Sequence, residues 1–242
     1  MHLNKSKTIH TSRTIMSNEL IEVMDFPKEN KGYVQIMDEN VFNKKTDSSK
    51  KKTITYLIQL YSFRNDDKKF ISLEDYWNKV EDSEKPLLAL LLAVSKDYLM
   101  SESVNLVKSV KHNNKASKEE FIANIEYFYP NRFSENTVRS ISQNIASSWK
   151  QAGYVLGKIK NIRTECKPSY LSVAFAFLMA YIDDCRGDYL FEHPSVKALD
   201  TTKDEILLLL KAASDRELLN FNKSGTSTIV SFDNYLNKIM NV

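Results

Sequence analysis

Glycine and proline, the two residues that most disfavour a helix interior, are scarce throughout this chain. Its 242 residues contain only five of each, so long helices meet few interruptions. This scarcity predicts a mainly α fold. Hydrophobic residues make up 42% of the chain and charged residues 27%, as in an ordinary globular domain. Twelve Tyr, twelve Phe and two Trp argue against disorder.

The longest apolar stretches, residues 86–94 and 170–182, are too short to span a membrane, which needs about 20 apolar residues. They are predicted to be buried helices. The opening stretch "MHLNKSKTIHTSR" has charge but no apolar core, so no secretory signal is expected there. Together with only two cysteines, Cys166 and Cys185, these features predict a cytoplasmic protein without a membrane partner.

Residues 1–99 are expected to form a helical region. Between about Asp47 and Phe63, apolar residues recur with the spacing of one buried helical stripe; they are Ile54, Leu57, Ile58 and Tyr61. Ser72, followed by acidic residues, is predicted to cap a helix that covers residues 72–77.

Five lysines gather around the start of the helix predicted near Asp47. The helix dipole disfavours each cation there by a few tenths of a kcal/mol to ~1 kcal/mol, and a bound anion would offset that cost. A solvated charge run is the main interpretation. Secondary phosphate contacts are the alternative, and they would be made by Lys44, Lys45, Lys50, Lys51 and Lys52.

Residues 100–167 are predicted to form a helix-turn-helix or winged-helix-like unit. Ser117 and Glu120 fit a capping box at the start of one helix, and the next helix is expected to start at Ser134. The turn between them contains Pro130, a spacing compatible with helix-turn-helix. After Gly153, the stretch "YVLGKIKNIRTECK" is expected to be a wing-like hairpin or a basic loop.

Residues 168–242 are predicted to be helical with one β-hairpin. A helix at about 169–185 is followed by one at 203–213, which Thr202 and Glu205 would cap. Alternating apolar residues around a turn at Ser224 and Gly225 predict the hairpin at 219–232. Residues 199–242 carry six acidic and five basic residues, which disfavours a phosphate-binding surface there.

The polar face of the helix predicted at 135–151 is the main functional signal. On a wheel at about 100° per residue, Val138, Ile141, Ile145 and Trp149 cluster on one side. The other side carries Asn, Ser, Gln, Arg and Lys, and the helix has a single acid, Glu135, at its start. Amides and guanidinium groups can read adenine and guanine edges.

Positive charge is concentrated on this helix and its flank. Residues 132–167 carry seven basic and two acidic residues, whereas the whole chain has a net charge of only +3. This pattern suits a surface that contacts phosphates. The candidate nucleic-acid-binding residues are Asn136, Arg139, Ser140, Gln143, Asn144, Ser147, Lys150, Lys158, Lys160 and Arg163. A solvated or protein-binding face is the alternative.

Catalytic motifs are lacking, so no enzymatic activity, cofactor, metal or small-molecule substrate is expected. The chain has no Gly-rich phosphate loop, no G-x-S-x-G, no H-E-x-x-H and no C-x-x-C. The acidic stretch 181–193 contains candidate metal ligands, namely Asp183, Asp184, Asp188, Glu192 and His193. These ligands make a metal-dependent nuclease an alternative. It is less favoured, because Arg186 and Gly187 suit a plain helix end.

The order of these features resembles the BrxA family, small accessory proteins of the BREX phage-defence systems. The resemblance covers residues 15–165 and rests on "MDENVFNKKTDSSKKKTITYLIQLY", then "KPLLALLLAVSKDYLM", then the helix-turn-helix-like block. It implies an all-helical, nonenzymatic, DNA-associated protein that works beside a methyltransferase and other defence proteins. We therefore expect a noncatalytic accessory that binds double-stranded DNA; a helical scaffold for a partner protein is the alternative.

Overall fold

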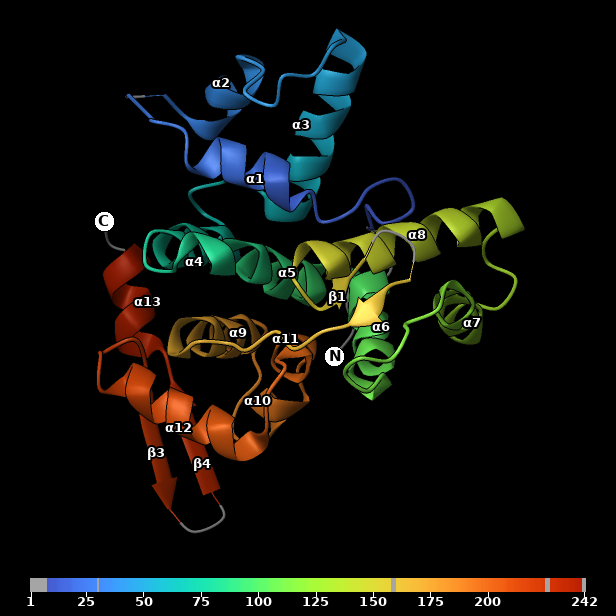
Figure 1. Ribbon diagram of the computed structural model, residues 1–242. Coiled ribbons are helices and arrows are strands. Elements are labelled where there is room, and N and C mark those ends of the chain that lie inside the picture. Colours follow the sequence, from blue (N-terminus) through green and yellow to red (C-terminus); the bar gives the residue numbers. More distant parts are fainter. Residues whose placement is uncertain (1–7, 30, 158–159, 225–226, 241–242) are drawn as a thin grey trace.

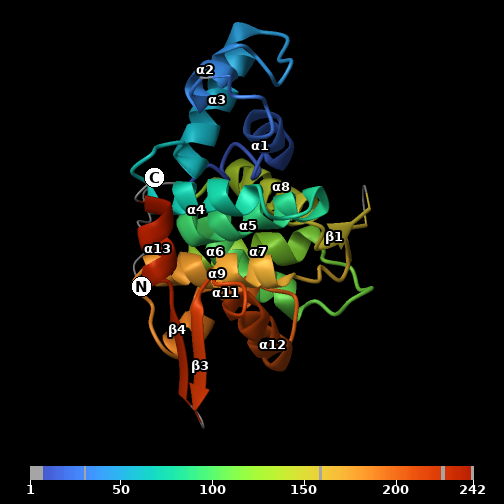
Figure 2. The same ribbon diagram turned by 90° about the vertical axis from the view of Figure 1, so that its left-hand side faces the viewer.

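The structure is a computed structural model, and it describes residues 8–29, 31–157, 160–224 and 227–240. These residues are mainly helical with two short antiparallel hairpins, which confirms the predicted fold class. The helices and hairpins are arranged in three tiers (Figures 1 and 2). Within the described part of the chain, no helix is long and apolar enough to cross a membrane.

The upper tier in Figure 1 contains the first three helices, α1 (Ser17–Met24), α2 (Tyr33–Asp38) and α3 (Asp47–Tyr61). Thr46 caps α3 by accepting a hydrogen bond from the backbone N–H of Ser49. Leu57 and Tyr61 are buried, as the stripe predicts. The Tyr61 hydroxyl donates to the carbonyl oxygen of Ile15 at 2.5 Å, which fixes α3 to the chain before α1.

The middle tier is built around two apolar helices, and both were predicted to be buried. It contains α4 (Lys68–Trp77), the 3-10 turn η1 (Asp82–Glu84), α5 (Lys85–Lys96), α6 (Tyr98–Ser109) and α9 (Tyr170–Ile182). Residues 87–94 of α5 and 171–181 of α9 are buried throughout. The two helices pack against each other, which confirms the prediction from their apolar sequences.

The predicted cap of α4 was wrong. The helix begins at Lys68, and Asp67 caps it by accepting hydrogen bonds from the backbone N–H groups of Lys69 and Phe70. Ser72 lies inside the helix, where its hydroxyl donates to the carbonyl oxygen of Lys68.

The region predicted as a helix-turn-helix contains α7 (Lys118–Phe128) and α8 (Glu135–Gln151), followed by the short strands β1 (Val155–Leu156) and β2 (Ile162–Arg163). Ser117 and Glu120 form the predicted capping box, and Ser134 caps α8. β1 and β2 pair antiparallel, and Ile162 of β2 also pairs with Lys115, just before α7. β2 therefore lies between β1 and the segment at Lys115.

The carboxy-terminal elements form the lower tier, except that α13 (Asp233–Met240) returns to the level of the middle tier beside α4 (Figures 1 and 2). These elements are α10 (Tyr189–Glu192), α11 (Pro194–Ala198), α12 (Lys203–Ser214), β3 (Asn220–Ser224), β4 (Ser227–Ser231) and α13. Thr202 and Glu205 form the predicted capping box of α12. The predicted hairpin is present, with Phe221 opposite Val230, while the turn residue Gly225 lies outside the described residues.

One cluster of buried hydrophobic side chains connects all three tiers, from Ile9 to Tyr235. α5 packs against α6 and α9, and α4 packs against α13. Helices from all three predicted regions (1–99, 100–167 and 168–242) therefore share a core. The predicted boundaries between these regions stay a prediction.

Candidate nucleic-acid interface

The first half of α8 exposes the polar residues that the wheel places together. Asn136, Arg139, Ser140 and Gln143 are exposed, and the side chain of Arg139 is 55% accessible. Val138, Ile141, Ile145 and Trp149 are buried on the opposite side, as predicted. Ser142, which interrupts the apolar stripe, is buried and donates a hydrogen bond to the carbonyl oxygen of Arg139. This half of the helix offers a guanidinium and two amides to solvent.

The second half of the polar face is covered by residues 8–16, which we call the amino-terminal segment. Asn144 donates from Nδ2 to the carbonyl oxygen of His10 at 2.9 Å. Gln151 accepts from the backbone N–H of Ser17 and donates to the hydroxyl of Thr14. Asn144 was predicted to contact nucleic acid, but its amide already binds the protein itself. Ser147 and Lys150 on this half are half-buried.

A buried polar network anchors the amino-terminal segment to α8. His10 Nδ1 lies 2.8 Å from Asp97 Oδ2, and His10 Nε2 lies 3.2 Å from Ser148 Oγ. The order of groups resembles a hydrolase triad. However, all three side chains are buried, and the Ser148 hydroxyl donates to the carbonyl oxygen of Asn144 and accepts from the N–H of Ile15. The network therefore joins parts of the fold and presents no accessible nucleophile.

Arg163 corrects the predicted set of phosphate contacts. Its side chain is only 1% exposed, and its guanidinium Nη2 lies 2.7 Å from Asp200 Oδ1. It also donates to the carbonyl oxygens of Val107 and Tyr154. A guanidinium with these buried partners cannot reach a phosphate on the surface. It instead joins β2 to the residues before α12.

Asp200 is the acidic centre of this buried junction. It accepts a hydrogen bond from the backbone N–H of Cys166 at 2.8 Å and also pairs with Lys108. Burial raises the pKa of Asp200, but Arg163, the backbone N–H of Cys166 and the charge of Lys108 together outweigh it and hold that pKa below its ordinary value. The carboxylate is therefore kept ionised, as the buried guanidinium requires.

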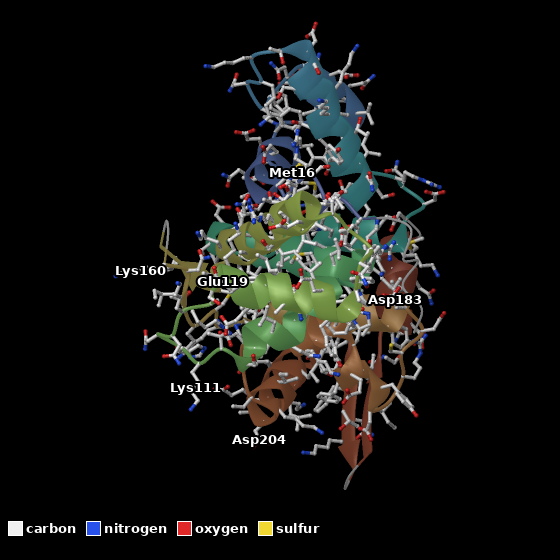
Figure 3. The ribbon with its side chains drawn as sticks, turned by 90° about the vertical axis from the view of Figure 1, so that its right-hand side faces the viewer. Met16, Lys111, Glu119, Lys160, Asp183 and Asp204 are labelled. Carbon is white, nitrogen blue, oxygen red and sulfur yellow. The ribbon has the colours of Figure 1, made fainter. Side chains whose placement is uncertain are left out.

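The structure describes one of the two lysines that were predicted to contact nucleic acid from the β1–β2 hairpin. Lys160 is exposed, and Figure 3 shows it projecting away from the body beside α8. Lys158 lies outside the described residues. Lys160 is therefore the described hairpin cation that can reach a polyanion lying along α8.

Of the five lysines near α3, two contact other residues and three are exposed. Lys44 Nζ lies 2.8 Å from Glu19 Oε1, and Lys50 Nζ donates to the carbonyl oxygen of Asp38. Lys45, Lys51 and Lys52 are exposed. The surface available for secondary phosphate contacts is therefore smaller than the sequence predicts.

The acidic stretch 181–193 is organised by side-chain pairing. Asp183 Oδ2 lies 2.7 Å from Lys69 Nζ and 3.1 Å from His193 Nε2, and His193 caps α11 through its other ring nitrogen. Burial raises the pKa of Asp183, but His193 and Lys69 outweigh it and lower that pKa. Within the described ranges, no group of three or more His, Cys, Asp and Glu residues could hold a metal ion. Asp183 and Lys160 lie on opposite sides in Figure 3.

Sequence reasoning missed two arginines that are held over aromatic rings. The Arg132 guanidinium, in the turn between α7 and α8, lies 5.3 Å from the Tyr98 ring and 5.2 Å from the Tyr129 ring. The Arg13 guanidinium lies 5.2 Å from the ring of Tyr56 on α3. Tyr129 lies close to Arg132 in sequence, but Tyr56 is far from Arg13, so no local pattern predicts that contact.

The exposed half of α8, the hairpin lysine and the turn arginine thus lie on consecutive elements of one block. No Asp or Glu occurs between residues 136 and 164. Such a surface can hydrogen-bond base edges and neutralise phosphates. Comparisons of the chain with protein-family models, curated proteins and solved structures find no match.

Proposed function

We propose that the protein binds double-stranded DNA through α8 and the β1–β2 hairpin, as a noncatalytic accessory of a bacterial phage-defence system. The observation that carries this proposal is the exposed first half of α8. There Asn136, Arg139 and Gln143 face solvent on a helix whose only acid is Glu135 at its start. A helix of this kind offers donors and acceptors to the major groove and does not repel the phosphates that border it.

The order of elements supports a winged-helix interpretation of this block. α7 and α8 are consecutive helices joined by a short turn, as a helix-turn-helix requires, and the β1–β2 hairpin follows directly. Pairing of Ile162 with Lys115 adds a third strand-like segment beside the hairpin. In helix-turn-helix proteins the second helix enters the major groove with its amino-terminal residues nearest the bases. The exposed half of α8 is the half that such docking would use.

The exposed side chains suit different parts of a DNA duplex. Arg139 can make a bidentate contact with guanine, and Gln143 with adenine. Lys150 and Lys160 suit the flanking phosphates. Arg139 also pairs with Glu135, one helical turn before it. Because this pair is exposed, its rupture costs roughly 0 to 1 kcal/mol, which a contact with DNA can offset.

The defence role rests on the resemblance to the BrxA family. That family implies work beside a methyltransferase and other defence proteins, and such proteins are the partners we propose. A DNA-binding block that shares its core with helices from the rest of the chain can hold such partners on other surfaces. Exposed apolar side chains are available for this purpose, including Leu208 on α12, which is 70% exposed.

A purely protein-binding scaffold is the second candidate, and one observation favours it. Tyr127 at the end of α7 is 79% exposed and packs edge-on against Phe128, so two aromatic rings border the turn before α8. Aromatic side chains are enriched in protein interfaces. The same helix-turn-helix surface would then contact a protein in place of DNA.

A salt titration separates the two candidates. Binding of the purified protein to a labelled duplex is measured between about 50 and 300 mM salt. Contact with about four phosphates predicts that log K falls with log salt at a slope near −4. No binding at low salt, or an affinity that does not change with salt, would reject DNA binding and favour the scaffold.

A further inference from the structure

We infer that the DNA-binding surface extends beyond the winged-helix-like block onto the upper tier, where Arg13 and Lys52 form a second phosphate-binding site. This inference rests on the proposed function, because it describes more of the same DNA path. The partner it requires is the sugar–phosphate backbone of duplex DNA that continues past α8.

The amino-terminal segment connects α8 directly to α3. On one side, Asn144 of α8 holds the carbonyl oxygen of His10. On the other side, Gln59 of α3 donates to the carbonyl oxygen of Thr8 at 3.4 Å, and Tyr61 donates to that of Ile15. In Figure 1, α3 stands above the body, α8 lies across it, and the segment fills the corner between them. The surface is therefore continuous from α8 to α3.

The three elements that meet here share an unusual composition. No Asp or Glu occurs in residues 8–16, 48–63 or 136–164, although the chain contains 31 of them. These stretches are far apart in the sequence, and folding brings them side by side. The nearest acids on these elements are Asp47 and Glu135, the first residues of α3 and α8. The three acid-free stretches between them do not repel a polyanion.

Arg13 is held in a fixed position on this surface. Its guanidinium carbon lies 5.2 Å from the centre of the Tyr56 ring, and Nη1 donates to the carbonyl oxygen of Ser12 at 3.0 Å. A guanidinium stacked on a ring keeps N–H groups at its edge for an anion, and it loses less conformational entropy on binding than a mobile side chain. Arg13 also lies close in sequence to a residue that contacts the polar face of α8. It follows His10 by three residues, and the carbonyl oxygen of His10 accepts from Asn144, the residue next to Gln143.

Lys52 continues the path along α3. It precedes Tyr56 by four residues, so the two side chains occupy the same face of the helix. Lys52 is exposed, whereas Lys44 and Lys50 already contact Glu19 and the Asp38 carbonyl. Arg13 thus lies over the Tyr56 ring, and Lys52 lies one helical turn before Tyr56 on α3, both within stretches that contain no acid. The nearby amide, Gln59, already donates to the carbonyl oxygen of Thr8, so the two cations suit phosphates better than base edges.

The test compares two duplexes that contain the same selected sequence, one of about 12 base pairs and one of about 30 base pairs. The shorter duplex covers roughly one helical turn and therefore the contact with α8 alone. Affinities are measured for the wild type, Arg13→Ala, Lys52→Ala, the double variant, and Lys211→Ala. The last variant removes an equal charge from α12, where Lys211 pairs with Asp215.

We expect the double variant to bind the long duplex roughly tenfold or more weakly, with a salt slope reduced by about two, and to bind the short duplex like the wild type. Lys211→Ala should match the wild type on both.

If the double variant binds the long duplex like the wild type while Arg139→Ala binds weakly, the extended surface is rejected and the proposed function stands. An equal loss on both duplexes also rejects the extension. If neither the wild type nor any variant binds either duplex, the proposed function itself fails. Lys52→Ala alone decides the case if Arg13→Ala lowers the melting temperature.

Discussion

His10 and Asp97 form a buried pair that holds the amino-terminal segment against the body of the protein. His10 Nδ1 lies 2.8 Å from Asp97 Oδ2, and the two side chains are 0% and 2% exposed. The same carboxylate accepts from the N–H of Ile9, and it caps α6 by accepting from the N–H groups of Leu99 and Met100. One side chain therefore positions both the start of a core helix and the segment that covers half of α8.

Removal of this carboxylate should be strongly destabilising. Asp97→Ala would leave His10 and several backbone N–H groups buried without their acceptor, and loss of one partner of a buried pair costs about 3 to 5 kcal/mol. Urea denaturation should show a decrease of that size in the free energy of unfolding. Glu119→Ala, which removes an exposed carboxylate, is the control and should change it by less than ~0.5 kcal/mol. An equally small effect of Asp97→Ala would show that the pair is not important for stability.

The same pair predicts how stability depends on pH. Burial raises the pKa of Asp97, but the charge and hydrogen bond of His10, with hydrogen bonds from Thr8 and Ile9, outweigh it and lower that pKa. A carboxylate with a lowered pKa in the folded state stabilises the protein above the unfolded-state pKa, about 3.9, and this contribution is lost as the pH falls through the folded-state value. Denaturation between pH 7 and pH 3 should therefore show a steeper loss of stability for the wild type than for Asp97→Asn. Parallel curves would contradict this.

Arg163 and Lys160 should respond in opposite ways to substitution. Arg163→Ala leaves Asp200 buried without its guanidinium, so we expect a loss of about 3 to 5 kcal/mol in the free energy of unfolding. Lys160→Ala removes an exposed side chain and should leave the melting temperature unchanged while it weakens DNA binding. Thermal unfolding of both variants, with a DNA-binding assay of the folded ones, checks both expectations. A fully stable Arg163→Ala protein would contradict the structural role of Arg163.

The sequence predicts best those features that depend on neighbouring residues. The capping boxes at Ser117 and Thr202 each need only a glutamate three residues later, and both are present in the structure. The same reasoning failed at Ser72, because the helix begins at Lys68 and its cap is Asp67, five residues before Ser72. Both residues are of types that cap helices well, and the helix capped by Asp67 also includes the buried residue Phe70.

The candidate site was less predictable because its polar residues have partners far away in the sequence. The helical wheel places Asn144 on the solvent side, but residues 8–16 cover that position. Arg163 lies in a basic stretch, yet its partner Asp200 lies beyond three intervening helices, α9, α10 and α11. Local patterns show which face of a helix is polar. They do not show whether another part of the chain occupies that face.

The acidic stretch at 181–193 should have no nuclease activity. Asp183 contacts Lys69 and His193, so its role is to join α9 to α4 and to the start of α11. We expect supercoiled plasmid and linear DNA to remain intact after incubation with the purified protein and Mg²⁺ or Mn²⁺. Asp183→Ala should lower the melting temperature, because it removes the acceptor of Nε2 of the buried His193 and the carboxylate that pairs with the half-buried Lys69. Cleavage by the wild type that Asp183→Ala abolishes would overturn the noncatalytic interpretation.

Arg139 and Lys150 should affect DNA binding differently, because the recognition model assigns them different parts of the duplex. Arg139→Ala or Gln143→Ala should cost about 1 to 3 kcal/mol on a selected sequence and less on random DNA, whereas Lys150→Ala should weaken both alike and lower the salt slope by about one. The melting temperature should barely change, because none of the three side chains lies in the core. Lys223→Glu reverses a charge on the β3–β4 hairpin and should leave affinity unchanged. If Arg139→Ala and Lys160→Ala stay folded and bind both duplexes like the wild type, the exposed face of α8 is an ordinary solvated surface.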